Sequence, residues 1–156
     1  LSEFGLENVK VKWPNDIYAG NKKITGILIE STLKGSMIET SVVGVGLNVN
    51  QLVFTSEKAT SMALEVGNDL DKELVLEKLS RNIESLYLQL KGGASEKLKA
   101  DYLKSMIGWG ERRSYRDKEG TFEGEILGVS ELGKLKVERG GNVREYDLKE
   151  IEFLWK

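Results

Sequence analysis

Three short segments carry the side chains that could do chemistry, at residues 12–16, 23–30 and 43–50. The chain has no His and no Cys, so a Ser-His-Asp triad, a thiol nucleophile and a Cys/His zinc site are excluded. Catalysis would have to use Lys, Arg, carboxylates, amides, hydroxyls or backbone groups. A fixed cation with aimed amide donors stabilises charge that develops on crowded anionic oxygens, and oxygen ligands suit a hard metal such as magnesium.

Lys23 is the candidate cation, because a position on a strand fixes its direction better than a loop would. A Lys beside another Lys is also commonly a solvated turn residue. Asn15 and Asp16 follow Pro14, which interrupts a strand pattern, so both can project into a site. Asn-Asp after Pro is equally common in turns, and both interpretations stay open.

Two glycines, Gly44 and Gly46, lie inside a strand pattern and not at a strand-to-helix turn, so they are no dinucleotide fingerprint. Glycine in a strand beside a pocket lets a ligand lie directly on the backbone, and Gly26 permits the same. Asn48 could then bind a phosphate or ribose, or form a turn. Trp13 suits packing, although its indole edge could border a pocket.

The surrounding elements begin with strands. Residues 9–19 alternate apolar and polar side chains, with an interruption at Pro14 that predicts a kink and a turn near Gly20. Further strands are predicted over residues 23–31 and 37–48, with a turn at Gly35-Ser36. Connections this short predict an antiparallel meander, because parallel pairs need long crossovers.

The pattern then becomes helical, with a predicted N-cap at Asp71 and a stop at Gly92-Gly93. The apolar face of this helix comprises Val75, Leu79, Ile83, Leu86 and Leu90. Shorter helices are predicted over residues 60–66 and 95–106. After Gly108, short strands separated by glycine turns predict a small barrel of about five strands. We therefore expect two domains, residues 1–107 and 108–156.

Composition limits the partners. With 23 basic and 25 acidic side chains the net charge is only -2, and the barrel's basic residues alternate with acidic ones, so no nucleic-acid patch is predicted. No apolar stretch approaches the ~18 residues of a membrane span. The absence of Cys suits a reducing cytoplasm, which is the expected location. The start lacks both a Met and a signal-peptide pattern, which predicts that the natural chain begins further upstream.

The order Lys12-Trp13-Pro14-Asn15-Asp16, Lys23-Ile24-Thr25-Gly26-Ile27-Leu28-Ile29-Glu30 and Gly44-Val45-Gly46-Leu47-Asn48 resembles the catalytic domain of biotin-protein ligases. Ala59-Thr60-Ser61-Met62 is similar to a helix start that follows in that family. The resemblance implies an α+β fold: an antiparallel or mixed sheet with packed helices, class II synthetase-like with its N-terminal half absent, followed by a small SH3-like β-barrel.

The resemblance also implies the reaction. ATP activates biotin to biotinyl-5'-AMP, with Mg2+, and the biotinyl group passes to a lysine of a biotin carboxyl carrier domain. Lys23 matches the family lysine that contacts biotin and the adenylate phosphate. Asp16 would orient the incoming amine or help to hold magnesium. The remaining implied biotin or adenylate contacts are Trp13, Asn15, Gly26, Ile27, Gly44, Gly46 and Asn48.

The sequence departs from the family in one element, since no Gly-Arg-Gly-Arg-x-Gly-Arg loop is present. In relatives this loop lies upstream and closes over biotin, so we expect residues 1–156 alone to be inactive. Two other functions remain open: a non-catalytic docking or dimerisation module, and a relative that transfers lipoate or octanoate. A homodimer could form through the sheet edge at residues 37–48.

Overall fold

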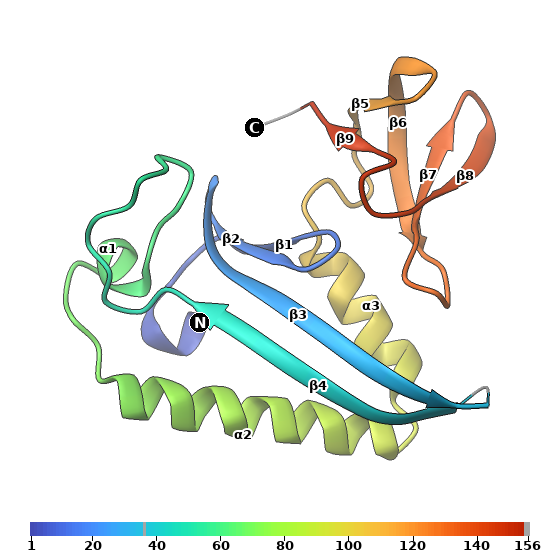
Figure 1. Ribbon diagram of the computed structural model, residues 1–156. Helices are drawn as coiled ribbons and strands as arrows, with labels where there is room; N and C mark the ends of the chain where they lie inside the picture. Colours follow the sequence, from blue (N-terminus) through green and yellow to red (C-terminus); the bar gives the residue numbers. More distant parts are fainter. Residues whose placement is uncertain (36, 155–156) are drawn as a thin grey trace. The chain divides into compact units, whose positions relative to one another are not determined.

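The computed structural model describes residues 1–35 and 37–154, so Ser36 of the predicted turn and the last two residues lie outside the description (Figure 1). The chain forms two compact units, Leu1–Gly92 and Gly93–Lys156. Each unit is built around its own antiparallel sheet, which agrees with the predicted α+β class. The division falls at Gly92-Gly93, before the third helix, and the predicted domain boundary near residue 107 stays a prediction.

The sheet of the first unit has the order β1-β2-β3-β4 and is antiparallel throughout, as the meander prediction required. Its strands are β1 (Val9–Lys12), β2 (Asp16–Ala19), β3 (Lys22–Lys34) and β4 (Met37–Leu47). The predicted kink at Pro14 is instead a full reversal, because β1 and β2 pair with each other from Val9↔Ala19 to Lys12↔Asp16. Pro cannot donate to a ladder and Asn-Asp favours turns, so the chain folds back there.

Capping side chains start the α-helices of this unit, and the N-cap predicted at Asp71 is confirmed. The Ser61 side chain caps α1 (Met62–Val66), and the Asp71 side chain accepts two backbone N–H groups at the start of α2 (Lys72–Lys91). A 3-10 turn, η1 (Ser2–Phe4), precedes the sheet. The core cluster is small and consists of Leu6, Ala19, Ile24, Met62 and Val75.

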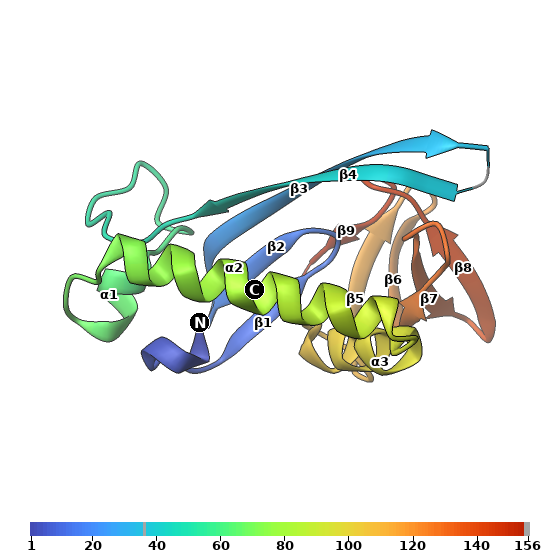
Figure 2. The ribbon, with the colours of Figure 1, turned by 90° about the horizontal axis from the view of Figure 1, so that it is seen from below.

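The apolar face predicted for α2 is buried only at its start. Val75 is 4% exposed, whereas Ile83, Leu86 and Leu90 are 44%, 50% and 51% exposed. Figure 2 shows α2 running alongside the long β3–β4 hairpin. That hairpin also exposes apolar side chains, at Leu28, Ile29, Leu33, Ile38, Val42 and Val43. Exposed apolar side chains that gather on one surface are typical of a face that another segment or partner covers.

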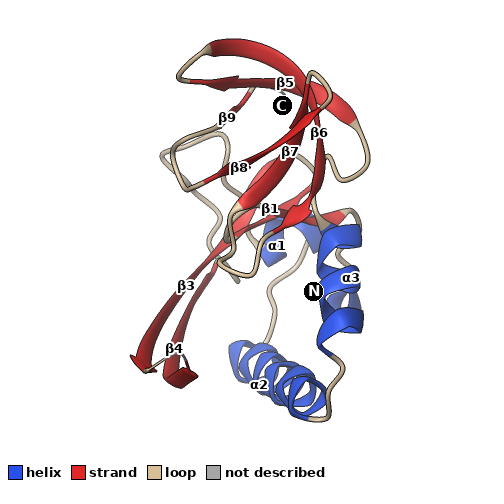
Figure 3. Cartoon of the chain, turned by 90° about the vertical axis from the view of Figure 1, so that its right-hand side faces the viewer, coloured by secondary structure: helices blue, strands red, loops and turns tan. Residues whose placement is uncertain are grey.

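The second unit starts with α3 (Ser95–Ser105) and continues into a strongly bent sheet of order β8-β7-β6-β5-β9 (Figure 3). Its strands are β5 (Arg112–Asp117), β6 (Gly120–Val129), β7 (Leu135–Arg139), β8 (Asn142–Tyr146) and β9 (Glu152–Phe153). Glycines with positive φ lie in the predicted turns, at Gly133, Gly140 and Gly141. The five strands agree with the predicted number, and the SH3-like assignment stays a prediction.

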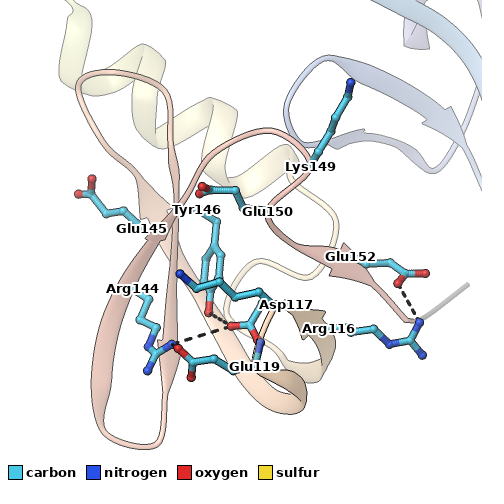
Figure 4. A pocket seen from close by; sticks show the side chains of 10 residues that line it. Arg116, Asp117, Glu119, Arg144, Glu145, Tyr146, Lys149, Glu150 and Glu152 are labelled. Atoms are coloured by element: carbon cyan, nitrogen blue, oxygen red, sulfur yellow. Dashed lines mark hydrogen bonds and ion pairs between the residues drawn. The ribbon is translucent and has the colours of Figure 1, made fainter.

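A buried carboxylate organises one end of this sheet. The Asp117 side chain is 3% exposed and accepts a hydrogen bond from the Tyr146 hydroxyl at 3.0 Å (Figure 4). It also accepts hydrogen bonds from Arg139 and, at 2.8 Å, from the Glu119 backbone N–H. Burial acts to raise the pKa of Asp117. The hydrogen bonds and the Arg139 charge outweigh burial, and they hold this pKa below its usual value.

Asp117, Glu119 and Tyr146 are among the residues that line a pocket of about 770 Å³ in the second unit. Its charges are largely matched within the unit, since Arg116 pairs with Glu152 and Arg144 with Glu119. Elsewhere on β5, Arg112 pairs with Glu138 and Arg113 with Glu111. A site for a charged ligand needs an excess of charge of one sign. The paired charges here therefore indicate a structural network.

Replacing Asp117 with Asn should destabilise the second unit by roughly 3 kcal/mol at pH 7, because Arg139 would lose its buried partner. A carboxyl with a lowered folded-state pKa contributes stability above its unfolded pKa of about 3.9, and the contribution is lost as the pH falls through the folded value. Urea denaturation at pH 7 and pH 3.5 should therefore show a flatter pH dependence in Asp117→Asn than in the wild type. Glu131→Gln, at an exposed turn position, is the matched control. An equal loss of unfolding free energy in Asp117→Asn and Glu131→Gln would show that the Asp117 network does not stabilise the second unit.

Candidate functional site

Three glycines, Gly26 on β3 and Gly44 and Gly46 on β4, form the base of the site, a glycine floor. Gly26 pairs with Gly46, and Leu28 pairs with Gly44. A Cβ at Gly44 would lie 3.8 Å from the Leu28 carbonyl oxygen, and one at Gly46 would lie 3.6 Å from the Gly26 oxygen. These are ordinary contacts, so sheet packing does not require glycine at either position. The missing side chains instead leave a pocket of about 460 Å³, which is lined by Asn15, Asp16, Lys23, Gly26, Ile27, Leu28, Gly44, Val45 and Gly46.

Lys23 and Asp16 meet at the edge of this floor. The Lys23 Nζ lies 2.6 Å from Asp16 Oδ1, and both would lie within 3.5 Å of a Cβ placed on Gly26. Their side chains are 43% and 28% exposed. A fixed ammonium group beside bare backbone is the arrangement expected where anionic oxygens of a ligand are to be held.

A bulge in β3 produces this meeting. Ile17 pairs with Thr25, but the next residue, Tyr18, pairs with Lys23, so Ile24 is an extra residue. Without the bulge Lys23 would point to the opposite face from Gly26, because side chains alternate along a strand. The extra residue lets Ile24 enter the core at 0% exposure while Lys23 turns toward Asp16.

Three predicted site residues have other contacts. Asn15 lines the pocket, yet its Nδ2 donates to the Ile27 carbonyl at 2.6 Å and so ties the turn to β3. Asn48 lies outside the pocket lining, and its Nδ2 donates to the Thr60 carbonyl at 2.9 Å. Trp13 is 6% exposed and outside the lining, which is the packing position considered for it. Direct ligand contacts of Asn48 and Trp13 stay predictions.

Sequence reasoning missed Leu28 and Val45 in the pocket lining, and it missed the backbone hydrogen bonds that join Lys23 to Lys58 and Thr60. Leu28 could have been found from the two-residue period of β3, since it follows Gly26 on the same face. The segment at 58–60 offered a weaker signal, the Thr60-Ser61 pair before an apolar run, which is typical of a helix start.

The predicted magnesium contact rests on one carboxylate. Asp16 is already paired with Lys23, and within residues 1–35 and 37–154 there is no group of three or more acidic side chains that could hold a metal. Magnesium in nucleotide enzymes is commonly bound by one or two carboxylates together with the substrate phosphates. A contact between Asp16 and magnesium stays a prediction, and no chemical step is assigned to it.

Comparison with known proteins places this geometry in a family context. Residues 3–48, which include β1 to β4, match the model of the biotin/lipoate A/B protein ligase family. The bifunctional ligase/repressor BirA of Bacillus subtilis is 29% identical over 147 residues, which cover 91% of this chain and 45% of BirA. The biotin–[acetyl-CoA-carboxylase] ligase of Mycobacterium tuberculosis is 29% identical, over 84% of this chain and 48% of that protein.

The fold comparison agrees. The biotin protein ligase from Aquifex aeolicus in complex with biotin and ATP superposes with a TM-score of 0.70 at 28% identity, covering 92% of this chain and 61% of that one. In sequence and fold, the chain is therefore similar to the biotin/lipoate ligases. Within that class it resembles the biotin-protein ligases along nearly its whole length. It spans less than half the length of the two sequence relatives.

None of the helices in the described part of the chain combines the length and apolar character needed to cross a membrane.

Proposed function

We propose that the chain is part of a biotin-protein ligase acting in the cytoplasm. A biotin carboxylate oxygen attacks the α-phosphorus of ATP, pyrophosphate leaves, and biotinyl-5'-AMP forms. A lysine amine of a biotin carboxyl carrier domain then attacks the acyl carbon, loses a proton and releases AMP. The observation that carries the proposal is the 2.6 Å pair of Lys23 and Asp16 above the glycine floor.

Each group has a role in this proposal. Lys23 would offset the charge that accumulates when a carboxylate approaches a phosphate, and Asp16 would hold the Lys23 ammonium in place and later orient the incoming amine. Gly26, Gly44 and Gly46 would let the adenylate lie on the sheet. Ile27, Leu28 and Val45 would supply apolar contact to biotin.

The remaining candidates differ in which ligand the floor accepts. A relative that transfers lipoate or octanoate would use the same Lys23 but a different acyl chain. A docking module would bind no adenylate. The similar proteins from Mycobacterium tuberculosis and Aquifex aeolicus support biotin, since both are biotin ligases.

Nuclear magnetic resonance of the isotope-labelled chain can test the proposal, because it detects weak binding. Adding a non-hydrolysable biotinyl-adenylate analogue should shift the amide signals of Gly26, Gly44 and Gly46 and leave those of β5 to β9 unchanged. A lipoyl-adenylate analogue should bind at least ~10-fold more weakly. Unmoved glycine signals at millimolar biotinyl analogue would favour the docking module.

Gly44→Ala should weaken binding of the biotinyl-adenylate analogue by roughly tenfold, about 1.4 kcal/mol, because a methyl group would occupy the floor. Stability should be unchanged, since the new Cβ would be 3.8 Å from its nearest neighbour. The Kd from the resonance titration and the Tm from circular dichroism are the two readouts. Ser41→Ala, at an exposed position earlier on β4, is the control. Unaltered affinity in Gly44→Ala would show that the ligand does not lie on this strand.

We further propose that residues 1–156 function together with an additional segment of the complete ligase. The exposed apolar side chains of α2 and the β3–β4 hairpin support this, since they offer surface that a further layer would bury. β4 is also an edge strand, which leaves backbone groups for a homodimer or for docking of the acceptor domain.

A further inference from the structure

We infer that Thr60 and Glu65 are positioning residues that aim Lys23 at the reacting oxygens, an inference that rests on the proposed function. The segment before α1 lies beside the start of β3 as a parallel bridge between Lys23 and Ala59. The Lys23 backbone N–H donates to the Lys58 carbonyl at 2.8 Å, and the Thr60 N–H donates to the Lys23 carbonyl at 2.9 Å. The backbone of Lys23 is thus held from this segment as well as from β2.

The backbone N–H, the carbonyl and the hydroxyl of Thr60 are all hydrogen-bonded. It is 1% exposed, its carbonyl accepts from Asn48 Nδ2 at 2.9 Å, and its Oγ1 donates to Glu65 Oε1 at 2.6 Å. A buried hydroxyl needs a partner, and the Glu65 carboxylate is a strong acceptor because it is charged. Glu65 is an exposed residue of α1, so this hydrogen bond links the position of α1 to the backbone of Lys23.

The direction of Lys23 depends on such restraints. A lysine side chain has a flexible four-carbon stem, so only its root and its Asp16 contact fix where the ammonium lies. Displacement of a catalytic group by about 1 Å can cost on the order of a hundredfold in rate. Loss of the Thr60 hydroxyl would loosen the strip at residues 58–60 without removing any group that touches substrate.

The test uses the complete ligase and measures biotin-dependent exchange of labelled pyrophosphate into ATP. Thr60→Val and Glu65→Ala should each lower kcat by roughly tenfold while the KM for biotin changes less than about twofold, because orientation and not binding is lost. Thr60→Ser and Glu65→Gln keep a donor and an acceptor and should recover most of kcat. If burial of Thr60 makes its valine variant unstable, the exposed Glu65 pair of variants carries the same test.

A double-mutant cycle separates positioning from general structure. In a Lys23→Ala background, Thr60→Val and Glu65→Ala should reduce the residual rate little further, since they act through Lys23. Equal losses in both backgrounds, or unchanged kcat in both single variants, would overturn the inference while leaving the proposed function intact. A wild-type ligase without biotin-dependent exchange would instead overturn the proposed function, and the inference with it.

Discussion

Replacing Lys23 with alanine in the complete ligase should lower kcat/KM for biotin activation by about a hundredfold or more. Loss of one preorganised charge donor typically has an effect of this size. The bulge at Ile24 turns this ammonium group toward Asp16 and the glycine floor. Arginine should not restore activity, because its planar fork cannot reproduce a compact ammonium group in the same space.

Lys22→Ala is the matched control for this prediction. Lys22 is the preceding residue, carries the same charge and is exposed, but it does not line the pocket. Its variant should keep kcat/KM within about twofold of the wild type. Wild-type kinetics in Lys23→Ala, or equal losses in the two variants, would disprove the assignment of Lys23.

Residues 1–156 alone should fail to biotinylate an acceptor domain to a detectable level. The Lys23 and Asp16 side chains are 43% and 28% exposed, so solvent reaches the charges that must act. A unit charge pair at 4 Å is worth about 1 kcal/mol in water and about four times that at an effective dielectric of 20. A covering segment would therefore be needed for the site to reach its full electrostatic strength.

Adding the remainder of the ligase in trans should restore labelling and should also cover the apolar side chains of α2 and the β3–β4 hairpin. Incubation with biotin, ATP, magnesium and an acceptor domain, followed by a streptavidin blot, measures the first effect. Binding of a hydrophobic dye measures the second. Unmixed wild-type chain and a mixture containing Lys23→Ala are the controls. Robust labelling by residues 1–156 alone would contradict this account.

Local patterns predicted most of the elements because their causes are local. The antiparallel meander follows from short connections, and α2 starts and ends where Asp71 and Gly92 predicted. The reversal at residues 13–15 was harder to foresee, since Pro14 and the Asn-Asp pair permit either a kink or a tight turn. The choice depends on which strand finds a partner, and that is a tertiary effect.

The site shows the same limit. The spacing of the glycines on neighbouring strands predicts the glycine floor. The face of the sheet on which the Lys23 side chain lies depends instead on a one-residue bulge, which no feature of the composition indicates. The Asn48 side chain donates to the carbonyl of Thr60, twelve residues further along the chain, a contact that the sequence pattern does not indicate, and the contact of Asn48 with a ligand stays a prediction. The exposed face of α2 is a third case, because amphipathic periodicity predicts that a face is to be buried without saying which segment covers it.

Exchange of labelled pyrophosphate into ATP by the complete ligase tests the central claim most directly, because it reports adenylate formation without requiring an acceptor. The account predicts exchange that depends on biotin, that is at least ~10-fold slower with lipoate or octanoate, and that falls by about a hundredfold in Lys23→Ala. Exchange supported by lipoate or octanoate but not by biotin, or no exchange with any of the three acids, would contradict it.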